Sequence, residues 1–239
     1  MSRCTGLRYF AGMLVDVVIP AYNEEASIGK VIEAIPQGVV REVVVVNNNS
    51  TDKTEEVAKG AGATVLKESF QGYGAACLKG ISHINAKDQL PDVLVFMDAD
   101  FSDHPEQIID VLEPIKKRGV AMVIGSRALG KRQRGSMTPQ QVFGNWLATR
   151  MMKSLYGVHY TDLGPFRAIQ MNALNQIDMQ DRTYGWTVEM QLKIAKANLP
   201  FEEVPVDYKK RIGKSKIAGT LKGTILAGYK IITTILKYR

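Results

Sequence analysis

The chain offers little of the chemistry that cysteine and histidine provide. Its 239 residues contain two cysteines, Cys4 and Cys77, and three histidines. Two cysteines without a CxxC pair exclude a disulfide framework and a zinc ribbon, so a reduced cytosolic protein is expected. The histidines lack partners at metal-ligand spacing, and His104 is expected to act as a local helix cap and not as a metal ligand.

Long hydrophobic runs are also missing. The first residues, MSRCTGLRYFAGM, contain two arginines but no apolar core of a signal peptide, so residues 1–13 are expected to be a disordered or start-site extension. Near the other end, Lys222, Lys230 and Lys237 interrupt each apolar stretch, which argues against a membrane-spanning helix. The sequence has no internal repeat and no low-complexity segment. A cytoplasmic globular protein is therefore expected.

Acidic residues are scarce in the C-terminal segment. Residues 207–239 contain nine Lys or Arg and one Asp, a balance of +8, whereas the other 206 residues sum to −1. A basic tail on a neutral body indicates a local anionic partner, or else a solvated basic face. Because the positive charge is confined and no aromatic–basic interleaving accompanies it, nucleic-acid binding is not expected.

Apolar runs alternate with helical patterns over the first 125 residues. Continuous Val and Ile runs are typical of strands covered on both faces, and strand–helix alternation indicates right-handed crossovers. The predicted fold class is therefore α/β, with a mainly parallel central sheet flanked by helices. The strand-like runs are 14–20, 42–47, 63–66, 92–98 and 120–125, and the helix-like stretches are 24–35, 52–60, 73–86 and 105–118.

Two carboxylates follow one of the buried runs. Asp98 and Asp100 come where the apolar sequence VLVFM ends. Like charges this close repel each other unless a proton or a cation lies between them, and Mg²⁺ or Mn²⁺ would resolve the repulsion. Helix-capping or solvent-facing aspartates are the alternative. Since ligands bind at the carboxyl ends of parallel strands, the position favours a metal site.

Polar segments follow other predicted strands as well. Tyr22 and Glu24 give the first strand end an aromatic face and a carboxylate, which suit stacking on a base and hydrogen bonding to it. Residues 47–52, NNNSTD, supply amides and hydroxyls that can also cap a helix. The sequence QGYGAA at 71–76 places a glycine turn before a helix, which favours phosphate. Its position after the third strand argues against a Rossmann dinucleotide site.

The second half of the chain is organised differently. Residues 128–138 form a polar, basic segment typical of a mobile loop, and a helix is predicted from about 139 to 156. A short segment, YTDLGPFRAI, precedes a helix at 187–197 and a strand at 201–207. Trp146 and Trp186 are expected in the core or at an interface.

Residues 217–239 are predicted to form a basic amphipathic helix. Such a helix can lie at a membrane interface or pack on the protein's own core. The residues expected on its apolar face are Leu221, Ile225, Gly228, Ile232 and Leu236, opposite the three lysines.

Five motifs occur in order within residues 14–217: PAYNEE (20–25), NNNSTDKT (47–54), DADFSDHPEQI (98–108), GSR (125–127) and RIGKSK (211–216). They resemble the motifs of family-2 glycosyltransferases with the GT-A fold, and most closely those of dolichyl- or polyprenyl-phosphate sugar synthases. The resemblance implies a nucleotide-sugar donor, Mg²⁺ or Mn²⁺, inverting transfer, and a glycosyltransferase domain over 14–216, with a nucleotide-sugar half (14–127) and an acceptor half (128–216).

The resemblance also implies roles for individual residues. Asp98 would face the ribose or the metal-bound diphosphate, Asp100 would ligate the metal, and Ser102 would lie near it. Glu189 corresponds to a glutamate in the acceptor half of the site. The implied nucleotide-binding residues are Pro20, Ala21, Tyr22, Glu24, Asn48, Gly72 and Asp98, and the implied phosphate- or acceptor-binding residues are Arg127, Arg132, Arg134, Arg211, Ser215 and Lys216.

Departures from the family pattern leave parts of the function open. Asn47 and Asn48 stand where relatives usually have two aspartates, so the base could be uracil or guanine. The missing QxxRW segment argues against a processive polysaccharide synthase, and the pair of C-terminal transmembrane helices found in some relatives is absent.

A lipid-phosphate acceptor at a membrane surface would need no general base, whereas a hydroxyl acceptor would need one, with Glu189 or Asp162 as candidates. The alternatives are a small soluble acceptor and a degenerate nucleotide-sugar-binding protein without turnover.

Overall fold

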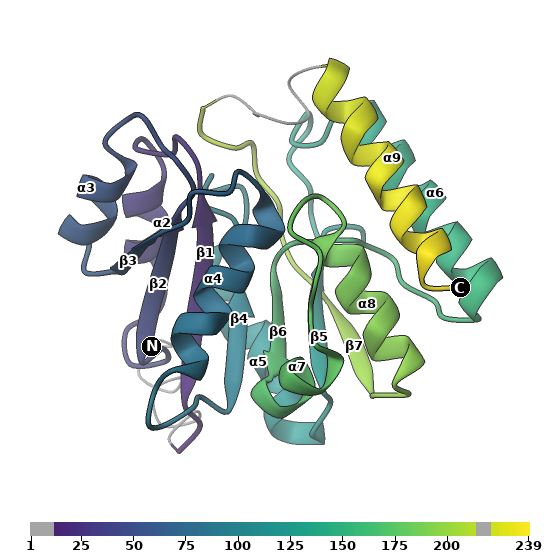
Figure 1. Ribbon diagram of the computed structural model, residues 1–239, viewed down its shortest axis with the longest axis horizontal. Helices are drawn as coiled ribbons and strands as arrows, with labels where there is room; N and C mark the ends of the chain where they lie inside the picture. The colour runs from purple at the N-terminus through teal and green to yellow at the C-terminus, as the bar shows by residue number, and fades with distance from the viewer. Residues whose placement is uncertain (1–11, 214–220) are drawn as a thin grey trace.

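One mainly parallel sheet organises the computed structural model, which describes residues 12–213 and 221–239 (Figure 1). Ser215, Lys216 and the first eleven residues of the predicted N-terminal extension lie outside the described residues. The strand order is β3-β2-β1-β4-β6-β5-β7. The strands are β1 (Val15–Ala21), β2 (Glu42–Asn47), β3 (Thr64–Lys67), β4 (Val93–Phe96), β5 (Met122–Ser126), β6 (Arg167–Gln170) and β7 (Phe201–Pro205).

Helices cover both faces of the sheet. One core cluster joins the sheet to α2, α3 and α5, and a second joins it to α4 and to α6 through α9. In the second layer, α6 and α9 lie side by side, and α9 also contacts α8 (Figure 1). The helices are α2 (Ile28–Ala34), α3 (Thr54–Gly60), α4 (Tyr73–Asn85), the short 3-10 helix η1 (Pro105–Gln107), α5 (Ile108–Arg118), α6 (Pro139–Tyr156), α7 (Met171–Ile177), α8 (Trp186–Lys196) and α9 (Leu221–Lys237).

Alternate residues of the strands enter opposite core clusters. Val17 and Ile19 belong to the cluster with α2, whereas Val18 belongs to the cluster with α4. Side chains of a strand point to the two faces in turn, so a strand buried on both faces needs a continuous apolar run. The predictions of an α/β class and of strands covered on both faces are therefore confirmed.

Strand β6 was not predicted. It runs antiparallel between β4 and β5, with Phe96 beside Arg167 in register, and α7 follows it directly. Arg167 is fully buried, and its guanidinium donates hydrogen bonds to the backbone oxygens of Gly164 and Thr187. A four-residue strand that begins with a buried arginine shows no hydrophobic periodicity, which is why the sequence pattern missed it.

Several helix starts differ from the predicted ranges. The predicted helix 24–35 begins at Ile28, and the backbone amides of Glu24 and Glu25 before it bond to Thr54 Oγ1 (2.8 Å) and Asp52 Oδ2 (3.2 Å). The predicted helix 105–118 begins with the 3-10 turn η1, and α5 follows from Ile108. The predicted helix 52–60 begins at Thr54. The expected cap role of His104 is not seen: it stands before η1, but its side chain makes no capping bond. Among the residues described, no helix is long and apolar enough to cross a membrane.

Candidate active site

A cleft of about 380 Å³ opens at the carboxyl ends of β1, β2 and β4. The structure brings together there the seven residues predicted to bind the nucleotide, together with Asp100 and Arg211. Thr183 and Tyr184, from the segment between α7 and α8, complete one wall. The lining residues are Pro20, Ala21, Tyr22, Glu24, Asn48, Gln71, Gly72, Tyr73, Ala76, Asp98, Ala99, Asp100, Thr183, Tyr184 and Arg211.

Three carboxylates gather at the end of β4. Burial, and then the charge of Asp100, raise the pKa of Asp98 to about 7. Asp103 is buried, and among the described residues neither of its carboxylate oxygens has a hydrogen-bond partner. Burial and the charges of Asp98 and Asp100 raise the pKa of Asp103 well above its usual range. Asp103 lies within the motif DADFSDHPEQI, but no role at the site was predicted for it from the sequence.

The turn after β4 is strained and holds Asp100 in place. Phe101 has a φ of +60°, a conformation that bulky residues rarely adopt and that occurs often at functional sites. Asp100 Oδ1 accepts hydrogen bonds from the amide of Ser102 (2.9 Å) and from its hydroxyl. The hydrogen bonds from Ser102, two residues later in the same turn, therefore orient the carboxylate of Asp100.

Arg211 is a cation that faces this turn. Its guanidinium bonds to Glu24 Oε1 (2.7 Å) and lies 3.1 Å from Asp100 Oδ2. The backbone of the same segment pairs with the turn, because Ile212 N donates to Asp100 O at 2.9 Å. The segment from 207 to 213 therefore runs along the acidic turn and brings Arg211 into the cleft.

The acidic pair fits a divalent cation that the substrate helps to bind. Within residues 12–213 and 221–239, no three Asp, Glu, His or Cys side chains converge into a complete metal cage. Mg²⁺ is usually held by one or two carboxylates together with substrate phosphates and water, so Asp98 and Asp100 would be sufficient protein ligands. A bound cation would also offset the burial and the charge of Asp100, which together raise the pKa of Asp98.

Asn48 organises one wall of the cleft that Tyr22, the residue predicted to stack on the base, also lines. Its side-chain amide donates to the backbone oxygens of Glu68 (2.9 Å) and Phe70 (2.7 Å). Its Oδ1 accepts from the amide of Gly72 at 2.8 Å. An amide is the only side chain of this size with two donors and an acceptor, and all three are used here. Aspartate, which relatives usually have at this position, could not donate the two bonds to the loop of residues 68–72.

Replacing Asn48 with aspartate should destabilise the fold. The change removes both donors and places a carboxylate against the oxygens of Glu68 and Phe70, so we expect a loss of about 2–4 kcal/mol in the free energy of unfolding. Urea denaturation measures the loss. Asn49→Asp is the matched control: its amide donates one exposed bond, to Ser69 O, and we expect its cost to stay below about 1 kcal/mol. Equal losses for the two variants would contradict the role of Asn48 in holding the loop of residues 68–72.

Close packing against the backbone of Arg182 explains why residue 72 is a glycine. A Cβ added at this position would lie 2.2 Å from the backbone oxygen of Arg182. The amide of Ala75, in the first turn of α4, donates to the same oxygen at 2.9 Å. Residues 180–185, here called the 180–185 loop, are thereby joined to the start of α4. Thr183 and Tyr184 reach the cleft from this loop, and no local pattern in the sequence indicated them.

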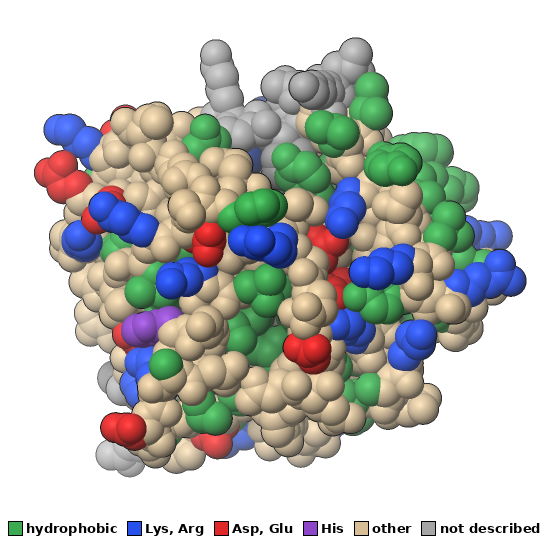
Figure 2. Space-filling view, in the orientation of Figure 1, with side chains coloured by type: hydrophobic (Ala, Val, Ile, Leu, Met, Phe, Trp, Pro, Cys, Tyr) green, Lys and Arg blue, Asp and Glu red, His purple; other side chains and the backbone are tan. Residues whose placement is uncertain are grey.

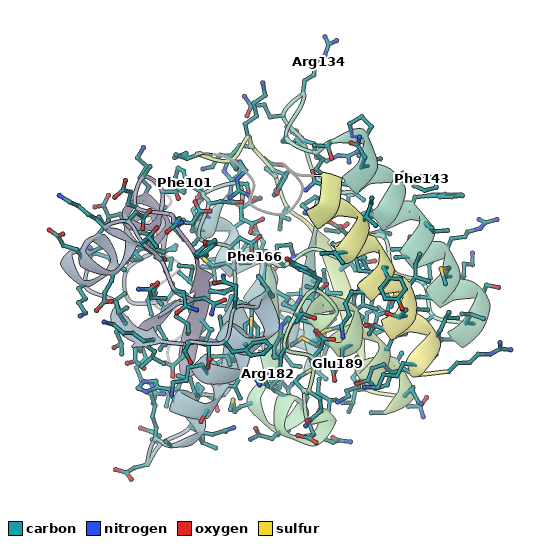
Figure 3. All side chains as sticks on the ribbon, turned by 45° about the horizontal axis from the view of Figure 1, so that its top comes forward. Phe101, Arg134, Phe143, Phe166, Arg182 and Glu189 are labelled. Atoms are coloured by element: carbon teal, nitrogen blue, oxygen red, sulfur yellow. The ribbon has the colours of Figure 1, made fainter. Side chains whose placement is uncertain are left out.

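Glu189 lies outside the cleft lining. It is fully buried beneath α9 (Figure 3), where its carboxylate accepts bonds from the amides of Gln180 (3.0 Å) and Asp181 (2.6 Å). It also accepts a bond from the hydroxyl of Tyr238 (2.6 Å) and pairs with Lys193 (2.9 Å). These contacts fix the 180–185 loop, so the surroundings of Glu189 favour a positioning role over the role of general base, for which it was a candidate only with a hydroxyl acceptor.

Arg127 and Asp162 form a buried pair. The guanidinium of Arg127 donates to both carboxylate oxygens of Asp162, at 2.7 and 2.8 Å, and lies over the ring of Tyr208. Burial raises the pKa of Asp162, but the charge of Arg127 and the hydrogen bonds outweigh it, so the pKa is lowered overall. Asp162 is thus held as an ion and is not placed to take a proton. Neither member of the pair lines the cleft.

The other predicted basic residues lie on the loop after β5. Arg132 and Arg134 are exposed, and Arg134 projects away from the body of the protein (Figure 3). Arg132 forms an isolated β-bridge with Tyr208, so this loop and the segment from 207 to 213 are neighbours. Neither arginine reaches the cleft lining.

The parallel α/β sheet and the acidic turn at the end of β4 define a glycosyltransferase of the GT-A class. The chain matches the family model for "Glycosyl transferase family 2" over residues 16–178, and it belongs to that family. The expected family and fold are thus confirmed.

Several relatives are similar over nearly the whole chain. The undecaprenyl-phosphate mannosyltransferase of Micrococcus luteus is 29% identical over 226 residues, which cover 88% of this chain and 90% of the relative. The dolichyl-phosphate hexose transferase of Haloferax volcanii is 30% identical over 231 residues, covering 93% and 94%. The solved structure of glucosyl-3-phosphoglycerate synthase from Mycobacterium tuberculosis with Mn²⁺, UDP and phosphoglyceric acid aligns with a TM-score of 0.77 and 22% identity, covering 98% of this chain and 81% of that one. The last likeness establishes the fold alone.

Proposed function

We propose that this glycosyltransferase moves a hexose, with inversion, from a UDP- or GDP-sugar to a polyprenyl or dolichyl phosphate at a membrane surface, and that it requires Mg²⁺ or Mn²⁺. The observation that carries the proposal is the placement of Asp98 and Asp100 in one cleft with Tyr22 and Asn48. The similarity to a lipid-phosphate mannosyltransferase and a lipid-phosphate hexose transferase supports the acceptor class.

The cleft has groups for each part of a nucleotide-sugar. Tyr22 exposes its ring for stacking on the base, and the start of α4 at Gly72 and Tyr73 presents a helix N-terminus to negative charge. A metal ion held by Asp98 and Asp100 would neutralise charge that develops on the leaving diphosphate. Arg211 stands next to that position and would add a second positive charge.

The two candidate general bases, Glu189 and Asp162, are both occupied by other partners, which favours a phosphate acceptor. Glu189 is enclosed by four partners, and Asp162 is paired with Arg127. A hydroxyl acceptor would need a base to remove its proton, whereas a phosphate monoester is already an anionic nucleophile. Arg132 and Arg134, on the loop next to the segment from 207 to 213, could attract such an acceptor.

A donor and acceptor panel tests the proposal. The protein is incubated with UDP-glucose, UDP-N-acetylglucosamine or GDP-mannose, with Mn²⁺ or Mg²⁺, and with a short polyprenyl phosphate, its dephosphorylated alcohol, or 3-phosphoglycerate. Mass spectrometry should detect a hexosyl phosphoprenol that forms only with metal and only from the phosphorylated lipid. Transfer to 3-phosphoglycerate alone would favour the soluble acceptor. Donor binding without any product would favour the degenerate binding protein.

Metal affinity should depend on pH through Asp98. Its pKa of about 7 lies above that of an unfolded aspartate, so between about pH 4 and 7 the folded protein holds a proton that the unfolded chain has released. The stabilisation from this proton is lost as pH rises through 7. Because a divalent cation must displace the proton, Mn²⁺ affinity should rise about tenfold per pH unit below 7 and level off above.

Titration calorimetry in buffers of different ionisation enthalpy measures this linkage. About one proton should be released per Mn²⁺ bound at about pH 6, and close to none from Asp98 at about pH 8. Asp98→Asn should remove this pH dependence and weaken the binding. An affinity that stays constant over this range would show that Asp98 is not part of the metal site.

A further inference from the structure

Helix α9 carries apolar side chains on two opposite sides. Ile225 and Leu236, two residues of the predicted apolar face, are exposed and do not pack on the protein. The inward side chains are Ile231, Thr234, Ile235 and Tyr238, whereas the exposed apolar side chains are Ile225, Leu226, Tyr229 and Leu236. The two predicted locations for this helix, the protein's own core and a water–lipid interface, are therefore compatible with each other.

The inner side of α9 is fixed to the catalytic body. Ile235 is fully buried, Lys230 Nζ lies 2.9 Å from Asp181 Oδ2, and the hydroxyl of Tyr238 bonds to Glu189. These contacts also join α9 to the 180–185 loop of the cleft. Rotation of the helix to hide its outer residues would break them, so the outer residues have no place in the protein's own core.

Helix α6 adds aromatic side chains to the same side of the molecule. Val142, Phe143 and Trp146 are exposed, with Trp146 at 55%, and the rings of Phe143 and Trp146 lie 5.8 Å apart. Phe143 projects outward from α6 (Figure 3). Hydrophobic side chains gather over α6 and α9 at the upper right of Figure 2. The α6–α9 surface is defined here as Val142, Phe143, Trp146, Ile225, Leu226 and Tyr229.

The two segments that carry this surface contain basic residues and no acidic ones. The segments 128–161 and 208–239, which include both helices, contain 14 of the 31 Lys and Arg residues and none of the 24 Asp and Glu residues. The rest of the chain carries 17 basic and 24 acidic residues. Lysine and arginine side chains border the hydrophobic side chains in Figure 2. An apolar surface carried by two segments that contain basic and no acidic residues is complementary to an anionic layer with a hydrocarbon interior.

We propose that the α6–α9 surface docks on an anionic lipid bilayer, with Phe143, Trp146 and Tyr229 inserted at the headgroup level. Tryptophan and tyrosine favour that depth, because their rings are apolar and their polar ends reach water. Basic side chains beside them are attracted to anionic headgroups, and the attraction falls with ionic strength. The inference deepens the proposed function, since it names the surface that brings the cleft to its lipid acceptor, but docking itself requires no sugar transfer.

Vesicle flotation tests the docking. The full chain should float with vesicles of phosphatidylcholine and phosphatidylglycerol, and less with phosphatidylcholine alone or at high salt. The double variants F143S/W146S and I225S/Y229S should each lower the bound fraction about tenfold or more. Leu90→Ser, an exposed leucine in the loop between α4 and β4, is the matched control and should float like the original protein.

Tryptophan fluorescence gives an independent reading. The chain has two tryptophans, and Trp186 is buried at 1% exposure, so a change on adding vesicles reports Trp146. We expect a blue shift, and quenching by lipids brominated near the headgroup. Trp146→Phe should lose both signals while it still floats.

The outcomes separate docking from catalysis. The two double variants should keep sugar transfer to a short polyprenyl phosphate in detergent, where no bilayer is needed. If this transfer is absent in the original protein while flotation succeeds, the proposed function fails and the docking stands. Flotation of both double variants at the original level, or no flotation and no blue shift, would overturn the docking. A dimer in sedimentation that both double variants abolish would overturn it too, because a second copy would then cover the surface.

Discussion

Replacing Asp100 with asparagine should lower sugar transfer about a thousandfold and abolish Mn²⁺ binding. The expected loss is large because Asp100, which lines the cleft, is the residue that the family resemblance assigns to the metal. The fold should survive the change. The retained amide oxygen can still accept from Ser102, and the exchange relieves the repulsion with Asp98 and Asp103. The loss should therefore appear in the turnover rate and in the metal affinity, not in stability.

Two measurements separate this loss from unfolding. Electron paramagnetic resonance of Mn²⁺ counts bound metal, and urea denaturation gives the free energy of unfolding. Asp88→Asn, at an exposed position away from the cleft, is the matched control, and its transfer rate and Mn²⁺ binding should not change. If Asp100→Asn kept its turnover, or if chelation left turnover intact, the metal assignment would be wrong.

Replacing Arg127 with methionine should have the largest effect on stability. The change leaves the carboxylate of Asp162 buried without its cation, and breaking such a pair costs about 3–5 kcal/mol. Two side-chain hydrogen bonds are lost with it, although the backbone amide of residue 127 can still donate to Asp162. Urea denaturation at neutral pH should show the loss as a lower midpoint with an unchanged slope.

A surface pair and a double variant show whether burial causes this effect. Arg118 bonds to Glu202 with similar two-pronged geometry, but both side chains are substantially exposed. Arg118→Met should therefore cost less than about 1 kcal/mol. The double variant R127M/D162N should be more stable than Arg127→Met alone, because it removes the unpaired buried charge. If the double variant were no more stable, the lost energy would come from packing and not from charge.

Most of the cleft lining at the edge of the sheet could be predicted from the sequence. Tyr22, Glu24, Asn48 and Asp98 each follow a strand that a continuous apolar run predicted, and parallel strands bring their carboxyl ends to one edge. Strand ends are encoded locally, and the topology of alternating strands and helices then leaves few arrangements. The resemblance to the family added Gly72 and Arg211, and both line the cleft.

The acceptor half was less predictable. Glu189 occurs in an expected motif, yet it is buried under α9 and bonds to a tyrosine 49 residues later in the chain. Thr183 and Tyr184 line the cleft only because the 180–185 loop joins the start of α4. Contacts of this kind depend on which segments meet in three dimensions, and residue spacing along the chain does not report them.

The sequence by itself determined the α/β class, the family and the edge of the sheet where the acidic pair lies, because apolar periodicity and strand ends are properties of short segments. Only the tertiary structure decided what each ionisable group does. It paired Arg127 with Asp162, set Arg211 between Glu24 and Asp100, and turned one apolar side of α9 outward beside α6. The physical reason is that the charge state of a side chain depends on its burial and on its nearest partner, and long-range packing fixes both.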